Sequence, residues 1–267
     1  MCKVIDKMIN IEKASKAFSE YVKPYDINNT KIELKVKHTF KTVEAAKKIA
    51  EDLKLNEEQK LLAELISLLH DIGRFEQVKI YNTFKDRDSI DHANLGVKIL
   101  FEDGIIRNFI KDTKYDATIY KAINNHNKFK IEKGLNSEEL LQARIVRDAD
   151  KTDIFRVFVE DIEKNNNVLY NYKEISKQII SPKVMENFEK YEQADRNEFN
   201  KGIDDYINII SFIFDYNYIT GLKIIKEKNY IERIMQPLCI YKETKEQMQE
   251  IIKIANTYIK ERIEKGS

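Results

Sequence analysis

The chain has 267 residues, and its 46 Lys and Arg residues balance 45 Asp and Glu residues, so the formal net charge is +1. Such a balance argues against a nucleic-acid duplex or an anionic membrane surface as the partner. No apolar run approaches the roughly 18 residues of a membrane span, so we expect no transmembrane helix.

The cysteine content and the N-terminal residues indicate the cellular compartment of the protein. Cys2 and Cys239 are the two cysteines, far apart in the chain, and they provide neither a disulfide framework nor a cysteine-based zinc motif. Residues 1–18 carry charges throughout and lack the apolar core of a secretory signal. We therefore predict a cytoplasmic protein.

Seven Gly and three Pro are few for this length, which favours helices. The first amphipathic pattern covers residues 36–53 and places His38 in its first turn. Asn56 is an N-terminal signal for a helix over residues 57–70, whose last turn carries His70. Gly73 is expected to end that helix.

The next stretch alternates between loop and helix. Residues 74–90 are polar and have no helical period, so we interpret them as a loop. A helix over 91–103 follows, with His92 in its first turn, and another over 115–126 ends at His126.

The remaining chain is also predicted to be helical. After a turn at Lys133-Gly134, Ser137 is the expected N-cap of a long helix that reaches residue 162. Further on, Ser181-Pro182 is typical of a helix start. Residues 203–214 are apolar on most sides and predict a central helix, and residues 245–263 form one apolar stripe. There is no repeat and no low-complexity linker, so we expect one all-α domain over residues 1–267.

The four histidines each lie at or near a predicted helix end, and two aspartates lie in similar surroundings. Any one of them alone is more simply explained as a satisfied core or surface residue. As a set they account for every histidine in the chain, in the order H, HD, H, H, D. These residues are His38, His70, Asp71, His92, His126 and Asp150.

Imidazole and carboxylate groups are suitable ligands for Fe, Mn, Zn, Co or Ni. Adjacent positions on a regular helix diverge by about 100°, so His70 and Asp71 cannot both chelate one ion unless the helix end bends. A bend near Gly73 would provide this freedom. It would also let the two oxygens of Asp71 bridge two ions.

The motifs VKHTF around His38, LLHDIG around His70 and Asp71, and RDADK around Asp150 resemble the HD-domain superfamily of metal-dependent phosphohydrolases. The resemblance covers roughly residues 34–160. His92 in DHANLG and His126 in NNHN extend it to a dinuclear subset. HD-GYP phosphodiesterases, HD-type diadenosine tetraphosphate hydrolases and inositol oxygenase share that arrangement.

The resemblance implies an all-α HD-domain helical bundle over about residues 34–160 with a C-terminal helical extension over 161–267. It also implies two divalent metal ions, drawn from Fe, Mn, Zn, Co, Ni or Mg, and a metal-bridging hydroxide as the nucleophile. One metal would take His38, His70, Asp71 and Asp150, and the second would take His92, His126 and the other oxygen of Asp71.

Some assignments within the motifs need a choice. The family's A-D-K step selects Asp150 rather than Asp148 as the ligand, and the ordinary alternative for Asp148 and Asp153 is ion pairing with Arg144, Arg147 or Lys151.

Two cations next to the ligands are further candidates for catalysis. Arg74 could grip phosphate bidentately, although it could instead pair with a carboxylate such as Glu76 at the surface. Lys151 could contact phosphate or simply be a charge on the helix surface. HD-GYP proteins carry Lys at the position of Arg74, and they have a second His where this chain has Asn127. No GYP triplet follows, which argues against a cyclic-di-GMP phosphodiesterase.

These observations predict a phosphohydrolase acting on a nucleotide or another small phosphate ester, with Asp71, Arg74 and Lys151 as catalytic residues. Phe75, Tyr81 and Phe84 either stack on a base or pack their own segment. One alternative is a diiron oxygenase of the inositol oxygenase kind, and another is a non-catalytic HD-type sensor. The C-terminal helices complete the core, cover the site or form a homodimer interface, and their pattern does not choose among these roles.

Overall fold

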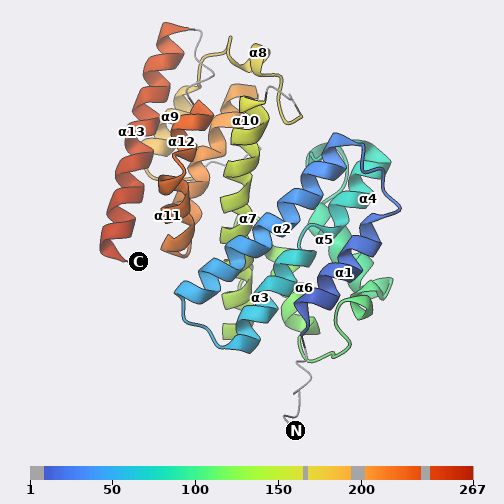
Figure 1. Ribbon diagram of the computed structural model, residues 1–267. Helices are drawn as coiled ribbons and strands as arrows, with labels where there is room; N and C mark the ends of the chain where they lie inside the picture. Colours follow the sequence, from blue (N-terminus) through green and yellow to red (C-terminus); the bar gives the residue numbers. More distant parts are fainter. Residues whose placement is uncertain (1–8, 165–167, 194–201, 236–240, 267) are drawn as a thin grey trace. The chain divides into compact units, whose positions relative to one another are not determined.

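A computed structural model describes residues 9–164, 168–193, 202–235 and 241–266. Within these ranges every regular element is helical, which confirms the predicted all-α class (Figure 1). None of the described helices is both long and apolar enough to cross a lipid bilayer. Cys2 and Cys239 lie outside the described residues.

The chain divides into two compact units, residues 1–150 and 151–267. The boundary falls inside the long helix α7 (Ser137–Glu163), which contributes to both units. A continuous helix crosses the boundary between the units. The single domain expected over residues 1–267 therefore stays a prediction.

Over residues 9–150, the described part of the first unit, there are six complete helices, the start of α7 and three short helical turns. They are α1 (Ile11–Val22), α2 (Thr30–Asp52), α3 (Glu57–Leu69), α4 (Ile72–Tyr81), α5 (His92–Val97), α6 (Asp116–Asn125), the 3₁₀ turns Asp86–Asp88 and Ile105–Asn108, and a π-helical turn at Lys98–Glu102. Helices α2 and α3 pack along each other. Phe18, Leu65 and Phe75 are fully buried in the core of this unit.

The expected start of the first histidine-bearing helix was wrong by two turns. Helix α2 begins at Thr30, where the Asn29 side chain accepts a hydrogen bond from the backbone N–H of Lys31. Ile32 is buried and extends the apolar face of the helix. His38 therefore lies in the third turn of α2 rather than in the first. The predicted Asn56 cap of α3 is confirmed, since its side chain accepts from the backbone N–H of Gln59.

The prediction of a loop over residues 74–90 was also wrong in its first half. Helix α3 ends at Leu69 and α4 starts at Ile72, with Gly73 inside it. Ile72, Phe75 and Val78 are buried at helical spacing, but the buried polar Gln77 interrupts the hydrophobic pattern. A polar residue in the core thus concealed the helix.

Gly73 brings α4 and α5 into backbone contact. A Cβ at this position would lie 2.3 Å from the carbonyl oxygen of His92 and 2.6 Å from the backbone nitrogen of Gly96. No side chain fits in this space, because both obstacles are main-chain atoms. Gly73 therefore holds His92 close to the start of α4, instead of ending α3.

The cap of α7 lies one residue before the one expected. The Asn136 side chain, not that of Ser137, accepts from the backbone N–H groups of Glu138 and Glu139. The carboxylate of Glu139 accepts from the backbone N–H of Asn136 in return. This reciprocal arrangement is a capping box.

The described part of the second unit contains the remainder of α7 and six further helices. They are α8 (Tyr172–Ile175), α9 (Pro182–Glu189), α10 (Gly202–Asn208), α11 (Ile219–Glu227), α12 (Tyr230–Met235) and α13 (Lys242–Lys265), with a 3₁₀ turn at Ile210–Asp215. Helix α13 packs against α9, α11 and α12.

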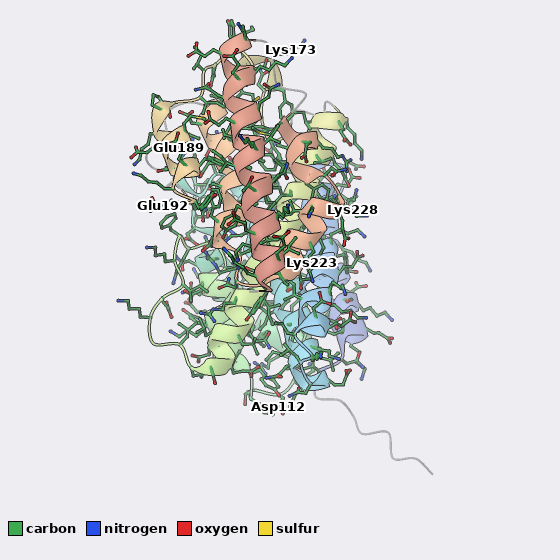
Figure 2. All side chains as sticks on the ribbon, turned by 90° about the vertical axis from the view of Figure 1, so that its left-hand side faces the viewer. Asp112, Lys173, Glu189, Glu192, Lys223 and Lys228 are labelled. Carbon is green, nitrogen blue, oxygen red and sulfur yellow. The ribbon has the colours of Figure 1, made fainter. Side chains whose placement is uncertain are left out.

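Two predictions for the second unit are confirmed and one needs correction. Pro182 starts α9 directly after Ser181, and the apolar stripe of α13 is buried at Met248, Ile251, Ala255 and Ile259. The helix expected over 203–214 is instead α10 followed by a 3₁₀ turn. Charged side chains such as Lys173 and Glu189 project outward from this unit (Figure 2).

Candidate metal centre

The six predicted ligands lie in helices or at helix ends, and they meet in the first unit. His38 lies within α2, while His70 and Asp71 occupy the junction of α3 and α4. His92 is the first residue of α5, and His126 directly follows α6. Asp150 projects from α7, and it is the one partly exposed member of a set that is otherwise buried.

Asp71 is at the centre of this set, and its two oxygens have different neighbours. Oδ2 lies 3.5 Å from Nε2 of both His38 and His70. Oδ1 lies 3.4 Å from Nε2 of His92 and 3.6 Å from Nε2 of His126. One pair of imidazoles therefore faces each oxygen, which is the arrangement that a bridging carboxylate requires.

Asp150 joins the pair that faces Oδ2. Its Oδ1 lies 3.0 Å from Nε2 of His38 and 3.6 Å from Nε2 of His70. Among the residues that the structure describes, there are three overlapping groups of three residues whose donor atoms lie within 4.8 Å of one another. One of these groups includes Asp150, and none includes Asp148. Asp153 forms an ion pair with Arg156.

Hydrogen bonds at Nδ1 determine the tautomer of three of the imidazoles. The Nδ1 atoms of His70 and His126 donate to the carbonyl oxygens of Ser67 and Ile123, both at 2.7 Å. Nδ1 of His92 lies 2.6 Å from a carboxylate oxygen of Asp86. A carbonyl or carboxylate can only accept here, so each Nδ1 carries the proton and each Nε2 lone pair faces Asp71.

The donor atoms fit a cation. Nε2 of His92 and Nε2 of His126 are 2.9 Å apart, although the proton of each ring is already used at Nδ1. Nε2 of His70 is buried and has no hydrogen-bond partner within the described ranges. Converging lone pairs in a buried site repel unless a positive charge lies among them, so these nitrogen and oxygen donors suit divalent metal ions.

The carboxylates are ionised despite their burial. Burial alone would raise the pKa of Asp71, but the charge of Lys35, together with His70 and Arg74, holds it well below its usual range. Burial opposes ionisation of Asp150 too, and the neighbouring His38 and His70 side chains keep its pKa well below its usual range. Burial and the charge of Arg74 lower the pKa of His92 to about 4, so this imidazole is neutral and available as a ligand.

Sequence analysis did not identify Lys35, whose Nζ lies 2.6 Å from Oδ2 of Asp71. Lys35 precedes His38 by three residues, so the two share one face of α2. This signal was lost because the helix was expected to start at residue 36. Asp86, which contacts His92, was also missed, because it lies in the segment interpreted as an unstructured loop.

Arg74 lies beside the centre, but its guanidinium has other partners. One terminal nitrogen donates to the carbonyl of Phe84 at 2.7 Å and to Asp86 at 2.8 Å, and Nε is 3.6 Å from Oδ1 of Asp71. Arg74 therefore does pair with a carboxylate, but with that of Asp86 and not with Glu76, which accepts from Tyr25 and Lys79. The catalytic assignment of Arg74 stays a prediction.

The second catalytic candidate, Lys151, and the three aromatic residues considered for base stacking differ in their surroundings. Lys151 forms an ion pair with Asp215 within the second unit, and its catalytic assignment also stays a prediction. Phe75 is buried in the core and Tyr81 is exposed. The ring of Phe84 lies under Nζ of Lys35, 5.3 Å from the ring centre, and beside Arg74.

Comparison with known protein families gives one match. Residues 36–154 match the HD domain family. No curated protein and no solved structure matched the chain.

Proposed function

Residues 36–154 form an HD domain, and from the ligand set inside it we propose that the protein is a metal-dependent phosphohydrolase acting on a nucleotide or another small phosphate ester. The observation that carries the proposal is Asp71, with one pair of imidazoles facing each of its oxygens. This geometry supports two adjacent divalent ions better than one.

The resemblance implies a division of the donor atoms between two ions. His38, His70, Asp150 and one oxygen of Asp71 would hold one ion, and His92, His126 and the other oxygen would hold the second. Bound divalent ions supply Lewis-acid activation of water and of phosphoryl oxygens. The chain itself keeps the ligands in the charge states that this requires, with both carboxylates ionised and His92 neutral.

Two cations next to Asp71 support a phosphorylated substrate. Lys35 approaches Oδ2 and Arg74 approaches Oδ1, and the Phe84 ring lies next to both. With metal on Asp71, the ammonium of Lys35 would be repelled from the carboxylate and could bind a substrate phosphate. Phe84 offers an aromatic face beside that phosphate, which would suit a nucleotide base.

The first experiment is to count metal ions per chain after purification without oxygen or chelators, and to assay phosphate release from nucleotides, monoesters, diesters and anhydrides. We expect two equivalents of metal and phosphate release that requires them. Asp71→Asn should lose both, whereas Asp88→Asn, which changes an exposed carboxylate in the same segment as Asp86, should lose neither. Iron-dependent oxygen consumption without phosphate release would instead establish the oxygenase alternative.

A further inference from the structure

Asp86 connects His92 to the segment between α4 and α5. Its Oδ2 accepts from Nδ1 of His92 at 2.6 Å. Its Oδ1 accepts from Arg74 at 2.8 Å and from the side-chain amide of Gln77 at 2.9 Å. The Asn127 amide donates to Oδ2 at 3.3 Å. The carboxylate is therefore held by donors on both oxygens.

Gln77 anchors this arrangement in the protein core. Its side chain is fully buried, and the same amide nitrogen that donates to Asp86 also contacts Oγ of Ser89 and the carbonyl of Ile90, both at 2.9 Å. A buried polar side chain is costly unless its hydrogen bonds are made. Gln77 therefore accounts for the position of the segment over 84–90, which places Asp86 opposite His92.

Two kinds of acceptor hold the Nδ1 atoms of His70, His92 and His126. His70 and His126 donate to backbone carbonyls three residues earlier, and helix geometry supplies these acceptors whatever the side chains are. His92 donates to a side-chain carboxylate from another segment. A change of one side chain can thus alter the second metal position while the first keeps its ligands and their acceptors.

We propose that Asp86 is a positioning residue for the second metal position, fixing the tautomer and direction of His92 so that its Nε2 faces Oδ1 of Asp71. The inference rests on the proposed function, because it assumes that His92 is a ligand. A carboxylate that accepts from the far nitrogen of a metal-bound imidazole raises the basicity of the ligand, and losing such a partner typically costs about 10- to 100-fold in metal affinity.

The test is a calorimetric titration of the metal-free full chain with Mn²⁺, together with electron paramagnetic resonance to detect coupling between two adjacent ions. We expect two equivalents and a coupled signal for the wild type. Asp86→Ala should keep the first equivalent and bind the second about 10- to 100-fold more weakly, with loss of the coupled signal. Asp86→Asn can still accept a hydrogen bond through its amide oxygen. Its affinity for the second equivalent should lie between that of the wild type and that of Asp86→Ala.

Ser89→Ala is the matched control, because it removes a partner of Gln77 from the same segment and leaves the contact between Asp86 and His92 in place. It should bind both equivalents as the wild type does. Thermal melts of the metal-free variants show whether each is folded, and Asp86→Asn is close enough in shape to keep the test decisive if the alanine variant is not.

The proposal is overturned if Asp86→Ala and Asp86→Asn bind both equivalents normally, if both equivalents weaken together, or if Ser89→Ala weakens the second as much as Asp86→Ala does. A wild type that binds fewer than two ions also overturns it. These results are distinct from a failure of the proposed function, in which the wild type binds two coupled ions that depend on Asp86 but releases no phosphate from any ester.

Discussion

At the level of single residues, the charge of Asp71 is compensated in a way that metal would change. Lys35 makes the closest described contact with this buried carboxylate, and its side chain is only 13% exposed. The ammonium is thus the main counterion of Asp71 in the metal-free protein. Divalent ions on the same carboxylate would take over that role, so Lys35 should matter differently in the two forms.

Lys35→Met should therefore destabilise the metal-free protein by about 3 kcal/mol, because removing one partner leaves a buried charge without its counterion. The metal-saturated variant should lose much less. Urea unfolding with chelator and with excess Mn²⁺ measures both values. An equal loss in the two conditions would mean that Lys35 contributes packing alone. Lys37→Met, two residues further along α2 at an exposed position, is the control.

A second residue-scale prediction concerns pH. The pKa of His92 is lowered from 6.5 to about 4 in the folded chain, with burial as the main cause. Between these two values the unfolded chain binds a proton that the folded chain does not, so stability falls as the pH drops from about 6.5 to 4. The loss from this group is at most about 3 kcal/mol.

Urea unfolding of chelated protein at pH 7.5 and pH 4.5 measures this effect. His92→Gln cannot titrate and should lose less stability than the wild type over the same interval. The same slope in both proteins would contradict a neutral, buried His92.

At the level of elements, the junction of α3 and α4 and its contact with α5 determine the geometry of the centre. Helix α3 ends before His70 and α4 starts at Ile72, so His70 and Asp71 lie between two helices. Their side chains are therefore not forced to diverge by the angle that a regular helix sets. Gly73 then lets the start of α5 approach, and this places His92 within reach of Asp71.

Gly73→Ala should destabilise the protein by about 1–3 kcal/mol and weaken the second metal equivalent, because its Cβ would collide with the main chain of α5. Gly96→Ala is the matched control on the opposite side of the same contact, where the nearest atom to a Cβ is at 3.4 Å. Its effect should be smaller. Chemical denaturation and Mn²⁺ titration of both variants test the idea, which fails if Gly96→Ala is the more damaging change.

At the level of the whole molecule, the ligand set lies in the first unit while α7, which supplies Asp150, continues into the second. Because one helix belongs to both units, we expect them to unfold together. Metal binding should then stabilise the whole chain, by about 3 kcal/mol at a hundred times the dissociation constant. Differential scanning calorimetry should show one transition that shifts upward with Mn²⁺. Two transitions, with only one responding to metal, would show that the units fold independently.

Much of the candidate site could be predicted from local information. The order His38, His70-Asp71, His92, His126 and Asp150 is visible in the chain, because metal-ligand chemistry restricts the residue types. Helix periodicity located α3, α6 and α13 closely, because each has a regular apolar face. Where the pattern was broken, as at buried Gln77 in α4, the prediction failed.

Tertiary structure alone decided which atoms meet. That one pair of histidines faces each oxygen of Asp71, that Lys35 compensates its charge, and that Asp86 orients His92 all depend on contacts between segments distant in the chain. Sequence periodicity reports which face of a helix is buried, and it contains no information on what that face meets. The residue types of the candidate metal centre were therefore determined by the sequence itself, whereas the neighbours of each donor atom were determined by how the helices pack.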